Sequence, residues 1–311
     1  MIDKKLSVVI PIYNEEPNIE VLYQRLSQVL QAVPYQWELI FVNDGSKDAS
    51  GFLVKQLRQK DRRVKYIEFS RNFGHQVAVT AGINHAFGDM VVIIDADLQD
   101  PPELILEMIK KWEEGYEVVY AKRKKRKGET WFKLFTAKLF YRLLRKITNF
   151  DIPLDTGDFR LIDKKVAENL RNMPERSRFI RGMVAWSGFR TIGIEYERHE
   201  RYAGETKYPF RKMLRFAIDG ITSFSYFPLQ LASYLGIFFS GISFMAIIVV
   251  LYLYFFTDKT IHGWTSTILA VLFIGGIQLF TLGIIGEYLA RIGTDVKQRP
   301  IYIIREKQLE D

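Results

Sequence analysis

The chain of 311 residues contains no cysteine, which excludes disulfide bonds and thiolate metal centres. Its four histidines are spread along the chain without a metal-binding spacing. The patterns Gly-x-x-x-x-Gly-Lys-Ser/Thr and Gly-x-Gly-x-x-Gly are also missing, so neither a P-loop nor a dinucleotide-binding turn is expected. Residues 1–7 carry no signal-peptide pattern, and we therefore expect the N-terminal domain to lie in the cytoplasm.

Two long C-terminal runs, at 229–256 and 265–286, lack charged residues. Each exceeds the roughly 20 apolar residues that cross a bilayer core, so we expect a transmembrane hairpin over 229–290. Buried helices of a soluble domain are the alternative. Basic residues precede the first run and follow the second. The positive-inside rule then predicts a multi-pass protein of the inner (cytoplasmic) membrane, with both termini and a tail at 291–311 in the cytoplasm.

The chain has a formal net charge of +8. Such an excess favours binding to nucleic acid, to an anionic membrane surface or to phosphorylated substrates. Residues 209–228 place an apolar stripe beside basic side chains, which predicts an interfacial helix on the inner leaflet or an ordinary amphipathic helix. Residues 133–148 form a basic, aromatic helical pattern that fits a membrane interface or a core-covering helix equally well. The basic run at 122–127 is read as a solvated loop or as part of a phosphate site.

The first half of the chain alternates short apolar runs with helical patterns. The predicted helices are 19–33, 50–60, 76–87 and 101–112, and the predicted strands are 6–12, 37–42, 64–69, 90–94 and 118–121. This alternation is typical of an α/β fold with a mostly parallel sheet that is covered on both faces. Ligands of such sheets bind at the carboxyl ends of the strands, where polar clusters follow four of the predicted strands.

Asp95 and Asp97 follow a fully apolar strand, and a turn there brings both carboxylates toward one ion. Hard cations such as Mg²⁺ or Mn²⁺ prefer oxygen ligands and often bridge phosphate oxygens. Most such aspartate pairs are solvated loop residues, but the buried strand before this pair favours a metal. Asp44, in the Asn-Asp-Gly-Ser segment after the second strand, either stabilises a turn or accepts a hydrogen bond from a base.

Six polar segments together resemble the family 2 glycosyltransferases with the GT-A fold. They are PIYNEE at 11–16, VNDGSKD at 42–48, RNFG at 71–74, DADLQDPP at 95–102, DTGDFRL at 155–161 and RYAGETKY at 201–208. The last two narrow the resemblance to polyisoprenyl-phosphate glycosyltransferases, such as dolichyl-phosphate mannose synthases and bacterial undecaprenyl-phosphate glucosyltransferases. The C-terminal hairpin is similar to the bacterial branch, which supplies lipid-linked glucose for O-antigen or cell-envelope modification.

The resemblance implies a GT-A catalytic domain over 1–208 and assigns roles to its residues. Asp95 and Asp97 would address the diphosphate and the metal, Asp158 would face the transferred sugar, and Arg201 with Lys207 would close over the donor and acceptor phosphates. The catalytic set is thus Asp97, Asp158 and Arg201. The residues implied to bind the nucleotide-sugar are Pro11, Tyr13, Glu15, Asp44, Asp95, Ala96 and Gln99.

The chemistry expected of such an enzyme is an inverting transfer of a hexose to a lipid phosphate. The acceptor is already an anionic nucleophile, so it needs positioning and charge shielding more than proton removal. Asp158 then orients a sugar hydroxyl or acts as a base, and a helix cap or a loop ion pair with Arg160 is the structural alternative. Cations at Arg123 and Arg126 and at Arg201 and Lys207 suit the acceptor phosphate, which explains the basic excess better than nucleic acid does.

The donor implied by the bacterial branch is UDP-glucose, while GDP-mannose, UDP-N-acetylglucosamine and an aminoarabinose donor are alternatives. A processive polysaccharide synthase would share the fold, but such enzymes usually carry a Gln-x-x-Arg-Trp motif and more spans, which this sequence lacks. A non-enzymatic membrane scaffold is the second rival, against which the intact acidic residues argue. Small residues in the two spans allow close helix packing, either within the hairpin or between protomers of a homo-oligomer.

Overall fold

The computed structural model describes residues 4–124, 156–176, 178–197, 227–256 and 263–310. The chain divides into two compact units, Met1–Arg215 with Arg299–Asp311 and Phe216–Gln298. The predicted helix at 133–148 and most of the predicted interfacial segment at 209–228 lie outside the described residues. Each unit is treated by itself below.

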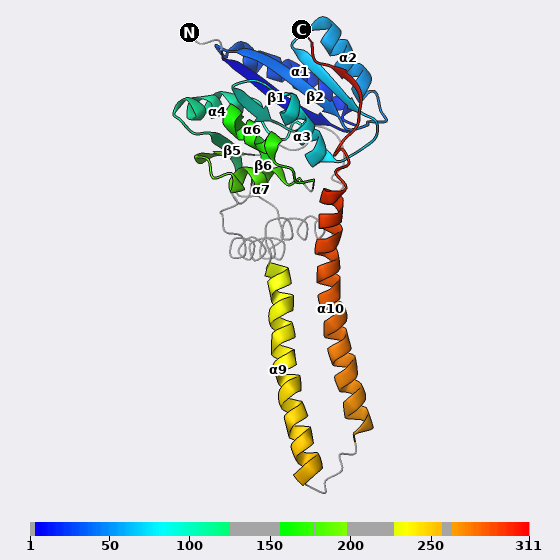
Figure 1. Ribbon diagram of the computed structural model, residues 1–311. Coiled ribbons are helices and arrows are strands. Elements are labelled where there is room, and N and C mark those ends of the chain that lie inside the picture. The colour runs from blue at the N-terminus through cyan, green and yellow to red at the C-terminus, as the bar shows by residue number, and fades with distance from the viewer. Residues whose placement is uncertain (1–3, 125–155, 177, 198–226, 257–262, 311) are drawn as a thin grey trace. The chain divides into compact units, whose positions relative to one another are not determined.

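The first unit is built on one mixed sheet with the strand order β7-β5-β6-β4-β1-β2-β3-β8 (Figure 1). β1 pairs in parallel with β2 and β4, and β2 pairs in parallel with β3. β6 runs antiparallel to β4 and β5, β7 runs parallel to β5, and β8 runs antiparallel to β3. The strands are β1 Lys5–Ile12, β2 Gln36–Asn43, β3 Val64–Phe69, β4 Met90–Ile93, β5 Val118–Arg123, β6 Thr156–Asp163, β7 Thr191–Tyr196 and β8 Ile304–Gln308.

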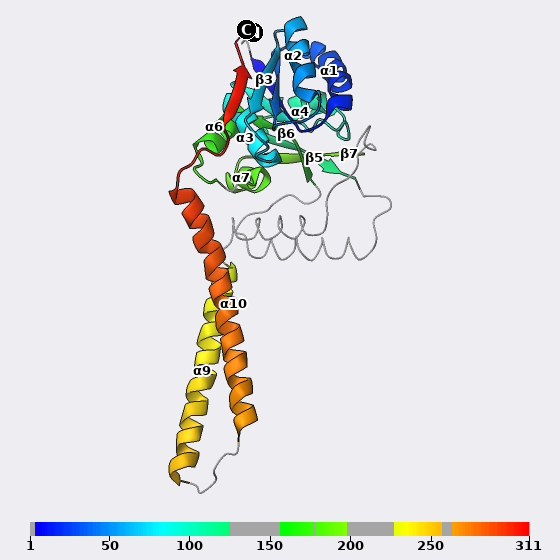
Figure 2. The ribbon, with the colours of Figure 1, turned by 90° about the vertical axis from the view of Figure 1, so that its right-hand side faces the viewer.

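Helices cover both faces of this sheet, as the turned view in Figure 2 shows. The helices of the first unit are α1 Glu16–Gln31, α2 Ser50–Lys60, α3 His75–His85, α4 Leu104–Glu113, α6 Lys164–Asn172 and α7 Ile180–Trp186. Alternate residues of β1, such as Leu6 and Val8, share one apolar core with side chains of α1 and α4. On the opposite face Val9 packs so closely under α3 that a Cβ on Gly82 would lie 2.1 Å from Val9 Cγ1.

These elements confirm the predicted α/β fold with a mostly parallel sheet. The apolar runs became strands with little change of boundary, because strands buried on both faces need continuous apolar sequence. Five elements were not anticipated from the sequence: β6, α6, α7, β7 and β8, the last of which returns to the sheet after the last helix. Just before β8, the ring of Tyr302 stacks on Phe69 at a centroid distance of 5.1 Å, and the Ile303 carbonyl accepts a hydrogen bond from the N–H of Ser70.

The described part of the second unit consists of two long apolar helices, α9 Phe227–Phe256 and α10 Trp264–Val296. The rings of Phe239 and Phe273 meet edge to face at a centroid distance of 5.3 Å, which places the two helices in contact. Both helices are long and apolar enough to cross a membrane. Their outer surfaces are strongly apolar, with Ile237 71% exposed and Leu279 72% exposed.

Candidate active site

The loops that follow β1 and β2 are joined by hydrogen bonds. Asn14 has a left-handed φ of 54°, donates its N–H to Ser46 Oγ at 3.0 Å and accepts at Oδ1 from the N–H of Lys47 at 2.8 Å. The N–H of Glu15 donates to Ser50 Oγ at 2.9 Å. Asparagine tolerates the left-handed conformation better than most residues, so the sequence itself favours this turn. The two loops therefore form one rigid wall at the carboxyl edge of the sheet.

Three of the residues predicted to hold the nucleoside lie along this wall. Pro11 is buried near the end of β1, and Tyr13, just beyond the strand, is 43% exposed. The carboxylate of Glu15 accepts a hydrogen bond from Asn18 Nδ2 at 2.5 Å, which fixes it at the start of α1. The ring of Tyr13 thus stands at the surface beside a fixed carboxylate, an arrangement that can accept a flat, polar ligand.

Asp44 ties the loop after β2 to the loop after β3. Its Oδ1 accepts from the N–H of Phe73 at 2.6 Å and its Oδ2 from the N–H of Gly74 at 2.9 Å. Burial raises the pKa of Asp44, and the two backbone donors oppose that rise only in part. Gly45 has a φ of 67°, and a Cβ there would lie 2.6 Å from the carbonyl carbon of Arg71, so only glycine fits between the loops.

Asp95, Ala96 and Asp97 form the turn after β4. Leu98 has a left-handed φ of 58°, and the N–H of Gln99 donates to Asp97 Oδ1 at 3.2 Å, which closes the turn. The side chain of Asp97 is 6% exposed. Asp95 Oδ1 is buried and accepts no hydrogen bond among the described residues. A buried carboxylate oxygen without a hydrogen-bond donor is costly unless a cation meets it, and His75 Nε2 lies 3.5 Å from this oxygen.

Asp158, at the start of β6, lies at the centre of a charged cluster. Its Oδ1 accepts from Arg181 Nε at 2.8 Å, and its Oδ2 accepts from Gln76 Nε2 at 2.9 Å. His75 Nε2 lies 3.1 Å from the same Oδ2 and 3.5 Å from Asp95 Oδ1. The imidazole therefore stands between the two carboxylates, one from the turn after β4 and one from β6.

The charged groups of this cluster shift the pKa values of one another. Burial disfavours the charged form of Asp158, but Arg181 and His75 outweigh it and hold the pKa of Asp158 well below its usual value. Burial also lowers the pKa of His75, while Asp95 and Asp158 more than reverse this and raise it to about 9. Burial, opposed by His75 and assisted by the neighbouring aspartates, raises the pKa of Asp95 to about 6. At neutral pH His75 is thus a cation.

A second polar corner joins β5, β7 and the turn after β4. Arg123 Nε donates to the hydroxyl of Tyr196 at 3.3 Å, and that hydroxyl donates to Asp100 Oδ1. A Cβ on Gly157 would lie 2.9 Å from Arg123 Nη2, so the glycine leaves room for the guanidinium. The structure therefore brings Arg123, one of the predicted acceptor-phosphate residues, next to the backbone that carries Asp158.

Three predicted site residues, Arg126, Arg201 and Lys207, lie outside the described residues. Sequence reasoning in turn missed His75, Gln76 and Arg181. His75 and Gln76 had a usable signal, because they directly follow the polar loop after β3 and must lie at the carboxyl edge. Arg181 had none, because only tertiary packing brings α7 to the start of β6.

The acidic residues of the turn after β4 suit a divalent cation. Among the described residues, no three histidine or acidic side chains are grouped to hold a metal ion by themselves. Mg²⁺, however, is usually held by one or two carboxylates together with substrate phosphates. Asp97 and Asp95 supply such a pair of carboxylates, and Asp95 Oδ1, which lies 3.5 Å from His75 Nε2, makes no hydrogen bond among the described residues. The donor set therefore fits the predicted Mg²⁺ or Mn²⁺.

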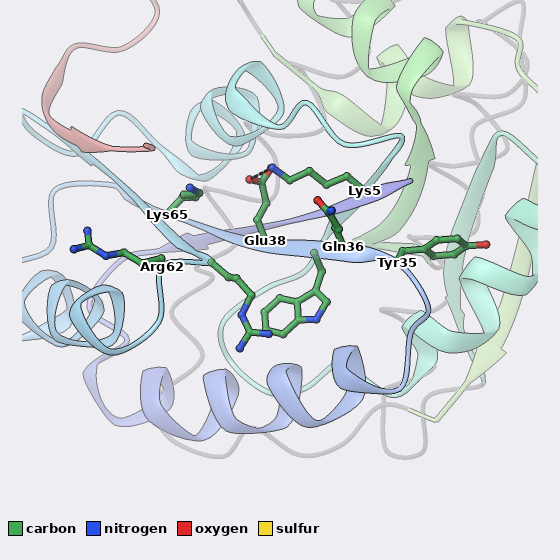
Figure 3. A pocket seen from close by; sticks show the side chains of 8 residues that line it. Lys5, Tyr35, Gln36, Glu38, Arg62 and Lys65 are labelled. Carbon is green, nitrogen blue, oxygen red and sulfur yellow. Dashed lines mark ion pairs between the residues drawn. The ribbon is translucent and has the colours of Figure 1, made fainter. Parts of the chain in front are cut away.

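A hollow of about 400 Å³ lies at the other edge of the sheet, at the amino ends of β1, β2 and β3 (Figure 3). In it Lys5 and Glu38 form an ion pair at 2.7 Å. Arg63 lies over the ring of Trp37 at 3.8 Å. The carboxyl edge of the sheet, where the acidic residues gather, is the better candidate for chemistry.

Carboxylates gathered at the carboxyl edge of an α/β sheet are the arrangement expected of a GT-A-like domain. The family model for glycosyl transferase family 2 matches residues 7–171. The chain belongs to glycosyl transferase family 2, and it is a glycosyltransferase.

Full-length relatives carry glycosyltransferase names. The chain is 57% identical to the uncharacterized glycosyltransferase YkcC of Bacillus subtilis (strain 168), over 96% of this chain and 93% of that protein. It is 46% identical to the uncharacterized glycosyltransferase sll0501 of Synechocystis sp., over 97% of this chain and 95% of that protein. It is 42% identical to the SfII prophage-derived bactoprenol glucosyl transferase of Shigella flexneri, over 97% of this chain and 98% of that protein.

Proposed function

We propose that the protein transfers glucose from UDP-glucose to a membrane polyisoprenyl phosphate, undecaprenyl phosphate, with inversion at the sugar centre. The observation that carries the proposal is the group of carboxylates formed by the partly buried Asp95 and the buried Asp97 and Asp158 in a family 2 glycosyltransferase. The 42% identity to a bactoprenol glucosyl transferase over nearly the full length supports the acceptor and the sugar. The product would be a lipid-linked sugar for O-antigen or cell-envelope glycosylation.

The reaction itself requires no proton transfer. An oxygen of the lipid phosphate forms a bond to the anomeric carbon, and the bond from that carbon to the donor diphosphate breaks. The diphosphate leaves with the electron pair as a nucleoside diphosphate. The protein must therefore orient two anions and shield their charges, which is a task for positioning and electrostatic stabilisation.

Asp97 and Asp95 are the residues that would hold the divalent cation, which when bound neutralises the leaving diphosphate. Pro11, Tyr13, Glu15 and Asp44, which lie at or just after the carboxyl ends of β1 and β2, are the residues proposed to hold the nucleoside. Arg123, whose guanidinium lies against Gly157, is proposed for the acceptor phosphate. Arg126, Arg201 and Lys207 are proposed for the same role from the sequence alone.

The second unit supports a membrane-bound acceptor. Large apolar side chains that are more than half exposed line α9 and α10, for example Phe238 at 61% and Phe280 at 59%. Such a surface is unfavourable in water and favourable in lipid, where a helix satisfies its own backbone. We propose that α9 and α10 cross the inner membrane as a hairpin with both chain ends in the cytoplasm.

The test is transfer of labelled sugar into the organic phase by the purified full-length protein. The reaction contains Mg²⁺ or Mn²⁺, undecaprenyl phosphate and one labelled donor from a panel of UDP-glucose, GDP-mannose and UDP-N-acetylglucosamine. Transfer from UDP-glucose is the expected result. Transfer from another donor would keep the reaction and replace the sugar, whereas a folded protein that transfers none of them would refute the proposal.

A further inference from the structure

The Asp158 carboxylate is held from two helices that approach it from different parts of the chain. Arg181, in α7, donates Nε to Oδ1 at 2.8 Å. Gln76, in α3, donates Nε2 to Oδ2 at 2.9 Å and accepts at Oε1 from the N–H of Ile180 at 3.0 Å. One amide side chain therefore fixes both Asp158 and the start of the helix that carries Arg181.

A second arginine near Asp158 has a different task. Arg160 is buried, and it donates to the carbonyl oxygens of Gly157 at 3.1 Å and Asp158 at 3.2 Å. Its guanidinium comes no closer than 3.9 Å to Asp158 Oδ1. Arg160 thus fixes the backbone of the strand, whereas Arg181 and Gln76 fix the direction of the carboxylate.

The hydrogen bonds also limit what Asp158 can do. A carboxylate has about four lone-pair positions, and Arg181, Gln76 and His75 engage three of them. The remaining position is on Oδ1, the oxygen that faces Arg181. A charged carboxylate in this state is a hydrogen-bond acceptor for one more donor. The low pKa of Asp158 agrees with this geometry and disfavours the uptake of a proton.

We propose that Arg181 is a positioning residue that acts through Asp158, aiming Oδ1 at a hydroxyl group of the donor sugar. This inference rests on the proposed function and adds a residue and a substrate feature to it. Asp158 then works as a fixed anion that orients the sugar. In this role Arg181 acts on the sugar only through the Asp158 carboxylate.

The first measurement is ligand affinity of the full-length protein, by calorimetry with Mg²⁺ present. Two pairs of ligands are compared, UDP with UDP-glucose and GDP with GDP-mannose. The wild type should bind one nucleotide-sugar more tightly than the matching nucleotide, because Asp158 Oδ1 accepts from the sugar. In Arg181→Gln this sugar-dependent gain should fall about tenfold, while the nucleotide affinity changes less than twofold. Arg181→Lys keeps the charge and should restore part of the gain.

The second measurement is turnover. Arg181→Gln should lower kcat about thirtyfold, and the donor KM should rise by up to about tenfold, in step with the weaker binding of the nucleotide-sugar. The double variant Arg181→Gln with Asp158→Asn should be no slower than Asp158→Asn alone, since the arginine acts only through the carboxylate. Arg190→Gln, which removes an equal charge from a side chain that lies over Tyr116, is the matched control and should leave kcat unchanged.

Several results would overturn the inference. Additive losses in the double variant would do so, and so would a loss of nucleotide affinity as large as the loss of kcat. A wild-type protein that binds every nucleotide-sugar no better than its nucleotide would also contradict it, even without any transfer assay. If Arg181→Gln lowers the unfolding temperature, Arg181→Lys is measured in its place. A folded lysine variant that no longer donates to Oδ1 should lose part of the sugar-dependent gain and part of kcat. If both stay at the wild-type value, the inference is wrong. Failure of the wild type to transfer any sugar, with the binding pattern intact, would refute the proposed function and leave the positioning role standing.

Discussion

The two edges of the central sheet both bury charged side chains, but they do so in opposite ways. At the amino edge, Glu38 accepts a hydrogen bond from Ser7 Oγ at 2.7 Å and pairs with Lys5 at 2.7 Å. Ser7 Oγ in turn accepts from the N–H of Gly88 at 3.0 Å. Each group in this run of hydrogen bonds has a partner, and the negative charge of Glu38 is met by Lys5.

At the carboxyl edge, most of the buried charged side chains are acidic. Asp44, Asp97, Asp100 and Asp158 are all buried there, and Asp95 has a buried oxygen without a hydrogen-bond donor. His75, Arg123, Arg160 and Arg181 supply four cations for these five carboxylates. Buried charge costs free energy unless it is compensated, so an excess of one sign points to a ligand of the opposite sign. The difference between the edges thus marks the site better than the hollow in Figure 3 does.

The largest effect is expected from Asp97→Asn. The variant removes one charge from the proposed metal site, and metal charge stabilisation is worth several kcal/mol in a transition state. Transfer of labelled sugar should fall by about a thousandfold, which corresponds to about 4 kcal/mol. Circular dichroism should show an unchanged fold. Retained activity would refute the metal assignment.

The second largest loss of activity is expected from Asp158→Asn. It keeps the shape of the side chain but weakens the acceptor that would orient the sugar, so we expect kcat to fall about a hundredfold. Affinity for the nucleoside diphosphate should stay within about twofold, since Asp158 does not border the proposed nucleoside site. An equal loss of nucleotide affinity would instead make Asp158 a binding or folding residue.

The same variant tests the charge balance of the carboxyl edge through its acid stability. Because the folded-state pKa of Asp158 is lowered, its stabilising contribution is present above the usual aspartate pKa and is lost as the pH falls through the folded value. Asp158→Asn should therefore be less stable than the wild type at neutral pH. Thermal unfolding in detergent should show this gap narrowing below about pH 4. A gap that stays constant with pH would contradict the assignment.

Glu38→Gln makes the matched change, from carboxylate to amide, at the amino edge. It weakens the ion pair with Lys5 and the hydrogen bond from Ser7, which should lower the free energy of unfolding by about 1–2 kcal/mol. The half-exposed Lys5 keeps this cost moderate. Turnover should be unchanged at temperatures where the protein is folded. A loss of kcat comparable to that of Asp158→Asn would remove the distinction between the edges.

The sequence allowed the carboxyl edge to be located because its signals are local. A fully apolar strand followed by Asp95 and Asp97 is visible within a few residues, and the alternating pattern sets the parallel sheet. The contacts of Arg181 and Tyr302 were not predictable in this way. They depend on how α7 and the residues before β8 pack against distant strands, and neither segment carries a motif for that packing.

The smallest effect is expected from Arg62→Gln, which removes a cation from the amino-edge hollow. Arg62 is exposed there, and substitutions at such positions usually change the free energy of unfolding by less than about 0.5 kcal/mol. Both turnover and nucleotide affinity should stay within about twofold of wild type. If the hollow instead bound the donor diphosphate, loss of this positive charge would weaken nucleotide binding severalfold, and more so at low salt. Calorimetry at two salt concentrations therefore decides which edge of the sheet meets the phosphates.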